Sequence, residues 1–438
     1  TSMGSKIGTP FLRGQTWWPY MKEFTTYLAR CSYLLERGQS VSDVLWYIGD
    51  EISHKPDQEY PFPAGYKYDY CNPDVLLNRL SVKDGLVVTP EGLSYKFIWI
   101  PENKRMLPET LEKLHALLEQ GATVVANAPQ RICTLAGGDE TQGRFDKNVE
   151  AIWGKAADGS ITTIGKGRLL AGVTIEKAIE LLDLKQDVQG DVRWLHRHVK
   201  GADWYFITPE KQQAFKGKVS FRAQGAAELW DPITGEITPL NVERQGEYAS
   251  IELDMPKAGS CFVVFNHNKK QQKVEKVELA NTQSIDNKWT VQFPEGWGAP
   301  AELEVETLAP WCELPMSKEG QAFSGTATYT TTFNWSNESK EVVLDLGKVS
   351  MIAEVFVNDQ KVRTLWCTPY AADITSFVKQ GENTLKVKVT STWFNRLAFD
   401  ASLPEAERKT WTIEGPKAGS KLKEYGLLGP VTLKSQAK

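Results

Sequence analysis

The sequence lacks the features that would point to a membrane or to a nucleic acid. No apolar run approaches the roughly 20 residues that a membrane span needs, and residues 1–6 do not read as a signal peptide. The net charge is only −4, from 51 basic and 55 acidic residues, and no long run of like charge occurs. Such a chain offers no electrostatic footprint for nucleic acid or an anionic membrane, so a neutral partner is expected.

Cysteine is scarce and scattered, which argues against both a disulfide framework and a zinc site. The sequence has six cysteines, no Cys-x-x-Cys pair and no histidine at metal-ligand spacing from a cysteine. We expect buried thiols at Cys31, Cys71, Cys133, Cys261, Cys312 and Cys367. Residues 165–168, Gly-Lys-Gly-Arg, do not match a phosphate-binding loop, because no complete glycine pattern follows a strand there.

The sequence is long and rich in aromatic residues. A chain of 438 residues is too long for a single core, and two to four domains are expected. The 15 Trp, 14 Tyr and 17 Phe residues can stack on the C–H faces of sugars, although most are expected to fill β-sheet cores.

The first strong element is a helix predicted over residues 17–37. An apolar stripe recurs at steps of four and three and so lies on one helix face. It consists of Trp17, Met21, Phe24, Leu28, Cys31 and Leu35. Thr16 is expected to cap the helix and Gly38 to end it. Burying each such side chain is worth about 1.5–3 kcal/mol, so the stripe should pack on the neighbouring α/β domain or on a second chain.

Residues 41–190 alternate between predicted strands and helices. Strands are expected at 44–48, 95–100 and 122–126, and helices after Asn72-Pro73, over 107–120 and over 174–184. This βαβ alternation implies a parallel sheet in an open α/β domain that resembles flavodoxin-like or amidotransferase-like accessory domains.

From Asp191 onward the pattern becomes all-β. Short strands are predicted at 193–200, 204–208 and 261–265, and again at 342–346, 353–357 and 384–389, with turns near Gly201 and at 231–235. Such spacing is typical of a sandwich or a jelly roll. The fold class is therefore multidomain α/β plus all-β.

Several long strings carry a specific resemblance. Residues 8–18 read GTPFLRGQTWW, residues 27–35 YLARCSYLL, residues 65–72 GYKYDYCN, residues 77–85 LNRLSVKDG and residues 194–197 WLHR. Together they resemble the α-L-rhamnosidases of glycoside hydrolase family 106, well over residues 8–270 and in general pattern beyond. The C-terminal part has its own resemblance, in residues 357–360, 370–375, 381–385 and 426–431, to the galactose-binding-like jelly rolls of family 2 glycosidases.

The resemblance implies four domains. Residues 1–40 would be the last βα unit of a (β/α)8 barrel, 41–190 a flavodoxin-like domain, 191–275 a small β-rich domain and 276–438 a galactose-binding-like jelly roll. It also implies inverting hydrolysis of terminal α-L-rhamnosides by two glutamates, with a calcium ion near the bound sugar and action in the periplasm or outside the cell. No cofactor is expected in this chain itself.

The family's catalytic glutamates cannot be placed on this chain, because the barrel strands that bear them would precede Thr1. The chain is therefore expected to be a C-terminal portion of a rhamnosidase and inactive alone. The alternative is a noncatalytic carbohydrate-binding or scaffolding module.

Candidate sugar contacts follow from placing residues 13–18 at the C-terminal face of a barrel, where such barrels build active sites. They are Arg13, Gln15, Trp17 and Trp18, with Asp69 and Asn72 as further polar contacts. Each has a structural alternative: the Trp residues as wedges between domains, Arg13 as a brace and Asn72 as a helix cap.

Three other groups stay open. Asp50 and Glu51 follow a strand and could form an acid-base pair, but adjacent loop residues more often point apart. His196 and His198 share a strand face at a spacing that can bind metal; without a third ligand, a hydrogen-bonded prop is expected. Sugar binding by Trp366, Trp393, Asn395 and Arg396 is also left open.

Overall fold

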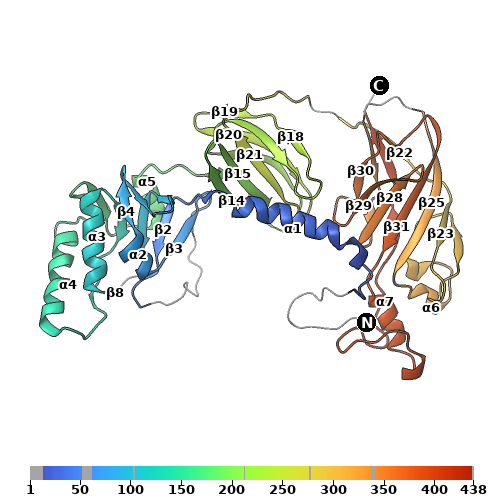
Figure 1. Cartoon of the computed structure of the whole chain (residues 1–438), viewed down its shortest axis with the longest axis horizontal. Coiled ribbons are helices and arrows are strands. Elements are labelled where there is room, and N and C mark those ends of the chain that lie inside the picture. The colour runs from blue at the N-terminus through green and yellow to red at the C-terminus, as the bar shows by residue number, and fades with distance from the viewer. Residues whose placement is uncertain are drawn as a thin grey trace. The chain divides into compact units, whose positions relative to one another are not determined.

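The computed structural model describes residues 13–51, 62–101, 104–211, 213–275, 278–336 and 341–436. Residues 8–12, the start of the first resemblance string, lie outside the described residues. The chain divides into two compact units, one of residues 1–31 and 275–438 and the other of residues 32–274 (Figure 1). No helix in the described part is long and apolar enough to cross a bilayer.

The predicted N-terminal helix is confirmed. A short 3-10 turn, η1 (Trp18–Tyr20), runs into α1 (Met21–Glu36). The expected cap is wrong: the Thr16 hydroxyl donates to the Ser391 carbonyl oxygen, 375 residues away in the sequence, rather than accepting from the helix. Gly38 ends the segment with φ +68°, and a Cβ there would lie 2.3 Å from the carbonyl oxygen of His198, so only glycine fits.

The apolar stripe of α1 is partly packed, but its Phe24 packs on the C-terminal β region rather than on the expected α/β domain. Cys31 is buried, and the Phe24 ring meets Trp366 edge-on with 5.7 Å between centroids. Leu28, however, remains 43% exposed. Cys71 and Cys261 are buried like Cys31, whereas the other three cysteines are half-buried, and all six are free thiols.

The α/β region is a six-stranded sheet in the order β11-β12-β9-β7-β2-β3, in which all neighbours are parallel except β11 and β12. Its strands are β2 (Val44–Tyr47), β3 (Tyr68–Cys71), β7 (Phe97–Ile100), β9 (Thr123–Ala126), β11 (Ile161–Ile164) and β12 (Gly167–Leu170). Numbered along the chain, the five parallel strands lie in the order 2-1-3-4-5, one of the two common doubly wound arrangements. The predicted parallel sheet is confirmed.

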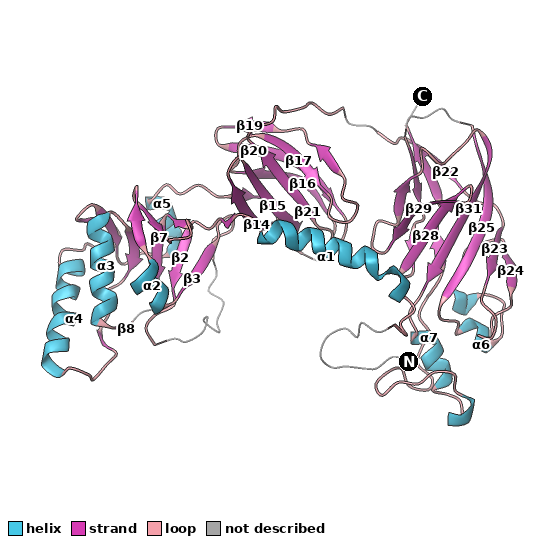
Figure 2. Ribbon diagram, in the orientation of Figure 1, coloured by secondary structure: helices cyan, strands magenta, loops and turns pink. Residues whose placement is uncertain are grey.

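Helices provide the apolar surfaces that bury this sheet. They are α2 (Pro73–Arg79), α3 (Pro108–Gln120), α4 (Gly138–Trp153) and α5 (Ile175–Leu181). Leu45 and Tyr47 of β2 join a core with α2, α3 and α4, whereas Val44 and Trp46 join a second core with α5. Successive strand residues point to opposite faces, so β2 is apolar throughout because both of its faces are covered (Figure 2).

Smaller strands complete the α/β region. A three-stranded sheet contains β4 (Ser81–Lys83), β5 (Leu86–Val88) and β6 (Ser94–Tyr95), and a two-stranded parallel one contains β8 (Arg105–Met106) and β10 (Arg131–Ile132). Asn72 caps α2 as predicted, because its Oδ1 accepts from the backbone N–H of Val75 at 2.9 Å.

The middle β region consists of two antiparallel sheets around one core. The first has the order β1-β14-β15-β21-β17-β18 and the second β13-β16-β20-β19. The first contains β1 (Gln39–Ser40), β14 (Val192–Val199), β15 (Ala202–Pro209), β21 (Cys261–Asn266), β17 (Ala226–Trp230) and β18 (Ile237–Pro239). The second contains β13 (Val188–Gln189), β16 (Phe215–Phe221), β20 (Tyr248–Met255) and β19 (Glu243–Gln245). Buried residues of both sheets, such as Tyr205 and Phe221, form the shared core.

Side chains of β14 and β15 also donate hydrogen bonds to carbonyl groups at and just after the end of α1, where the helical bonding pattern stops. Trp204 Nε1 donates to Leu34 at 3.0 Å, and the Arg197 guanidinium donates to Arg37 and Gly38 at 2.9 and 2.8 Å. The WLHR string therefore fixes the chain after α1 to the first sheet.

The C-terminal β region is again built from antiparallel sheets, in the orders β24-β23-β25-β31-β28-β29 and β22-β33-β26-β30, with a small β27-β32 pair. The first contains β24 (Glu302–Val305), β23 (Trp289–Gln292), β25 (Thr326–Trp335), β31 (Gly381–Thr390), β28 (Ile352–Val357) and β29 (Gln360–Leu365). The others contain β22 (Asn281–Ser284), β33 (Thr432–Ser435), β26 (Val342–Asp345), β30 (Ala371–Asp373), β27 (Lys348–Val349) and β32 (Leu427–Gly429). Short helical segments are η2 (Trp311–Glu313), α6 (Lys318–Gln321), α7 (Phe394–Asp400) and η3 (Glu405–Glu407).

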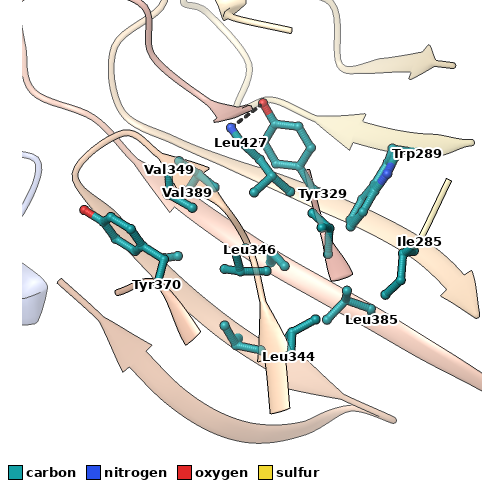
Figure 3. Packing of buried hydrophobic residues seen from close by; sticks show 14 of the residues in the cluster. Ile285, Trp289, Tyr329, Leu344, Leu346, Val349, Tyr370, Leu385, Val389 and Leu427 are labelled. Carbon is teal, nitrogen blue, oxygen red and sulfur yellow. Dashed lines mark hydrogen bonds between the residues drawn. The ribbon is translucent and has the colours of Figure 1, made fainter. Parts of the chain in front are cut away.

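One large core lies between these sheets. Figure 3 shows Trp289, Tyr329, Leu344 and Leu385, which come from both sheets and belong to the same buried cluster. The Tyr329 hydroxyl is buried with partners: Trp311 Nε1 donates to it at 2.6 Å and the backbone N–H of Leu427 at 3.3 Å. Satisfying this hydroxyl lets the aromatic ring stay in the core.

Candidate functional site

The predicted sugar contacts near the N-terminus lie on one short segment. Arg13 is exposed, Trp17 is half-buried, and Trp18 is 36% exposed at the start of η1. Gln15 lines a cavity in the unit that contains the C-terminal β region. The Trp393 Nε1 group donates to the Gly14 carbonyl at 2.6 Å and so ties this segment to α7.

Asp69 and Asn72 belong to the other unit, on β3 and at its end. Asp69 accepts a hydrogen bond from the Tyr95 hydroxyl at 3.0 Å, which gives its carboxylate a structural partner. Asn72 is exposed and its side-chain oxygen is used in capping α2. Asp69 and Asn72 thus lie near each other along β3 and its C-terminal end. Each side chain makes a hydrogen bond that supports the local structure.

The carboxylates after β2 do not form an acid-base pair. Asp50 accepts from the Leu107 backbone N–H at 2.7 Å and from the Thr110 hydroxyl at 2.6 Å, at the start of α3. Glu51 instead pairs with Arg105 at 2.9 Å. The two side chains serve different structural contacts, as adjacent loop residues usually do.

A larger constellation surrounds His196, in a cavity of about 760 Å³ between the α/β and middle β regions of residues 32–274. Asp203 is its centre: His196 Nε2 and His198 Nδ1 lie 3.1 and 2.7 Å from its Oδ1, and His267 Nε2 lies 2.8 Å from its Oδ2. Three imidazoles therefore share one carboxylate. The hydrogen-bonded prop expected of His196 is what the structure contains.

His196 is held on its other side by a second buried carboxylate. Its Nδ1 lies 2.9 Å from Asp187, which also accepts from the Tyr205 hydroxyl at 3.1 Å. Burial opposes protonation of His196, but the hydrogen bonds with Asp187 and Asp203 outweigh it, so the pKa of the imidazole is raised. For Asp203, burial acts to raise the pKa, but the hydrogen bonds from His196 and His198 outweigh burial and lower the pKa to about 2.

Arg222, which also lines this cavity, forms an ion pair with Asp43 of the α/β region. The Arg222 guanidinium lies 2.9 Å from both carboxylate oxygens of Asp43 and 3.8 Å from Asp187. Burial raises the pKa of the Asp43 carboxyl, although the adjacent guanidinium acts in the opposite direction. Asp43 immediately precedes β2 of the α/β sheet, and Arg222 immediately follows β16. The pair therefore connects these two strands.

Only part of this cluster of histidines and aspartates could be predicted from the sequence. Pairing of β14 and β15 sets His198 opposite Asp203, so the turn at Gly201 and the alternating pattern could have supplied that contact. His267 follows β21 and joins only through the long-range pairing of β15 with β21. Within the described ranges no group of three or more His, Cys, Asp or Glu residues is arranged to hold a metal ion.

The cluster predicts a stability window in pH. His196 has a raised pKa, so its contribution is fully present below the unfolded value of 6.5 and is lost as pH rises through the folded value. Asp203 has a lowered pKa, so its contribution is present above 3.8 and is lost as pH falls toward 2. In the whole chain, the unit of residues 32–274 should therefore unfold at the highest urea concentration between pH 3.8 and pH 6.5. Asp203→Asn should flatten the profile; an unchanged profile would contradict this assignment.

The fold is that of a multidomain protein, with separate α/β and β-sheet regions. The model of glycoside hydrolase family 106, described as alpha-L-rhamnosidase, matches residues 2–244, more than half of the chain. The chain belongs to this family. A second model, described as glycosyl hydrolase 2 galactose-binding domain-like, matches residues 317–422.

Two relatives extend these matches. The solved structure of a rhamnosidase from Novosphingobium sp. PP1Y is 30% identical with a TM-score of 0.90, and the alignment covers 99% of this chain and 43% of that one. A Formosa agariphila protein provisionally named a β-glucuronidase is 30% identical over 290 residues, 63% of this chain and 24% of that protein. The chain thus spans less than half the length of either relative.

Proposed function

We propose that this chain forms part of an inverting α-L-rhamnosidase that releases terminal α-L-rhamnose from glycans or glycosides. The observation that carries the proposal is the similarity to the Novosphingobium rhamnosidase, which extends over 99% of the chain at a TM-score of 0.90. Family membership over residues 2–244 supports it. Glycosides are the substrate class of that family.

The proposed domains are those suggested by the resemblance strings: a barrel-terminal βα unit over 1–40, a flavodoxin-like domain over 41–190, a small β-rich domain over 191–275 and a galactose-binding-like jelly roll over 276–438. The 2-1-3-4-5 order of the parallel strands supports the flavodoxin-like assignment. The match over residues 317–422 supports the last one.

In this proposal the segment from Arg13 to Trp18 contacts the substrate. Arg13 is exposed, and its guanidinium offers five donors in a fixed fork that can bridge two sugar hydroxyls. Gln15 lines a cavity, and the Trp17 and Trp18 rings provide flat apolar faces. Asp69 and Asn72 are proposed as further polar contacts, Asn72 through the amide nitrogen that the cap does not use.

Inversion needs a general acid and a general base about 6.5–9.5 Å apart, with a water molecule between them. We assign neither role within this chain; two of its half-buried carboxylates, Asp50 and Asp203, are engaged in structural hydrogen bonds. The proposal is that this chain alone gives no turnover. The competing function, a noncatalytic carbohydrate-binding module, shares that outcome but predicts no hydrolysis by the complete gene product either.

We propose that this chain itself holds no cofactor and that the calcium ion implied by the family belongs to the complete enzyme. Among the described residues, no group of three or more His, Cys, Asp or Glu side chains is arranged to hold a metal ion. We further propose action in the periplasm or outside the cell, in keeping with a glycan substrate.

The test is the stereochemistry of the first product. Hydrolysis of an aryl α-L-rhamnoside by the complete gene product, followed by proton NMR, should give β-L-rhamnose first and the α-anomer only by later mutarotation. Initial release of the α-anomer would indicate retention and would refute the inverting mechanism.

A further inference from the structure

The cavity that Gln15 lines is formed mainly by residues that the proposed contacts of the Arg13–Trp18 segment leave out. Its volume is about 540 Å³, enough for a sugar residue, and it belongs wholly to the unit of residues 1–31 and 275–438. Besides Gln15, its wall includes Trp393, Phe394, Lys417, Ser420 and Lys423. Aromatic and hydrogen-bonding groups thus meet in one concave surface.

The wall formed by α7 is rigidly supported from beneath. Arg396, which is 1% exposed, donates to Asp400 at 2.6 Å and to Glu319 at 2.7 Å. Asn395 and Lys423 exchange two hydrogen bonds, at 2.9 and 2.8 Å, through the Asn395 amide and the Lys423 backbone. The segment that carries Lys423 is therefore fixed to α7, and the cavity is built before any ligand arrives.

The indole of Trp393 is held on two sides. Its Nε1 donates to Gly14, next to Gln15, and its ring lies 5.3 Å from that of Trp297. Being only half-buried, the ring still presents surface to the cavity. A flat ring held in one orientation can stack on the C–H face of a pyranose with little loss of side-chain entropy.

Polar groups surround this ring with nearly balanced charge. The Ser420 hydroxyl accepts from the Lys417 backbone N–H at 3.0 Å, which leaves its own hydrogen able to point to a ligand. Lys423 Nζ lies 4.1 Å from the centroid of the Phe394 ring. Lys417, Lys423 and Glu414 all line the cavity, so its net charge is only +1 and its polar groups can bind sugar hydroxyls.

We infer that this cavity is a subsite for a neutral sugar residue of the substrate, the one to which the terminal rhamnose is attached. Trp393 takes the C–H face of that sugar, and Gln15, Lys417 and Ser420 bind its hydroxyls. The inference rests on the proposed rhamnosidase function for the identity of the glycan. The ligand contacts themselves come from the cavity.

The test is binding to this chain, without catalysis. Rutinose, the rhamnosyl-glucose disaccharide, is titrated into the chain and followed by saturation-transfer NMR and tryptophan fluorescence. Trp393→Ala should weaken binding at least tenfold. The matched control is Trp366→Ala, a half-buried tryptophan that packs on Phe24 and Tyr27 and does not line the cavity, and it should bind like the wild type.

A second variant keeps the test decisive if Trp393→Ala does not fold. Lys417→Ala/Ser420→Ala removes two groups at the cavity wall and one hydrogen bond of an exposed loop, and it should weaken rutinose binding severalfold with little change in melting temperature. Binding that neither variant weakens, or no binding by the wild type, would overturn the inference. Binding of rutinose through Trp393 in a protein whose complete gene product does not cleave rhamnosides would instead refute the proposed function alone.

Discussion

Replacing Asp400 with alanine should destabilise the unit of residues 1–31 and 275–438 by about 3–5 kcal/mol, because it leaves the buried Arg396 without its nearest counter-charge. Both side chains are 1% exposed, and their nitrogen and oxygen lie 2.6 Å apart. Asp400 also accepts from the backbone N–H and hydroxyl of Thr410, both at 2.6 Å. The loop after α7 therefore loses its anchor at the same time. Urea unfolding monitored by tryptophan fluorescence measures the loss.

The matched control removes a neighbouring charge that is exposed. Lys409 pairs with Glu319, the second partner of Arg396, but its side chain is 45% exposed. Lys409→Ala should therefore cost less than about 1 kcal/mol. Replacing both buried charges, as Arg396→Met/Asp400→Leu, should recover only the part of the loss that comes from the unpaired charge, since Thr410 still lacks its acceptor. A loss below 1 kcal/mol for Asp400→Ala would mean that the pair contributes little.

Replacing Arg222 with alanine should have a comparable effect on the unit of residues 32–274. It removes the guanidinium that pairs with Asp43 and lies 3.8 Å from Asp187; these two carboxylate side chains are 6% and 4% exposed. Asp187 keeps its contacts with His196 and Tyr205, so Asp43 is the carboxylate left without its counter-charge. Leaving a buried charge uncompensated costs about 3–5 kcal/mol. It also removes the donor to the Lys185 carbonyl, at 2.9 Å, that helps to hold the α/β region on the middle β region.

The pH dependence separates this mechanism from a simple packing defect. Without the guanidinium, the pKa of Asp43, already raised by burial, should rise further, so the folded variant takes up a proton that the unfolded chain does not. The stability difference from the wild type should then shrink as the pH is lowered. The control is Arg193→Ala, an exposed arginine 3.6 Å from Glu210, which should leave stability nearly unchanged. A difference that stays constant with pH would indicate lost packing instead.

The parts of the fold that could be predicted are those governed by local periodicity and local chemistry. The apolar run at β2 and the leucine spacing of α3 reveal a covered sheet and an amphipathic helix, because both signals lie within a few residues. Asn72 before a proline marks a helix start for the same reason. The Thr16 cap was wrong because a contact with Ser391 outcompetes it, and nothing near Thr16 in the sequence records that contact.

The sites were less predictable, because they are assembled from distant segments. Gln15 could be singled out from its motif, but the Trp393 ring beside its segment comes from a helix 378 residues further along. Asp203 receives histidines from β14 and from the end of β21, and only the strand pairing brings them together. Arg396 and Asp400 are visible as a helical i, i+4 pair, but the sequence gives no sign that both are buried.

The central claim, membership in a working rhamnosidase, is tested most directly by comparing two substrates. The complete gene product is assayed side by side on aryl α-L-rhamnoside and aryl β-D-glucuronide, since one relative is provisionally named for the second activity. The account predicts turnover of the rhamnoside in the ordinary enzymatic range of about 1–1000 per second and none of the glucuronide. Turnover of the glucuronide alone, or of neither substrate, would contradict it.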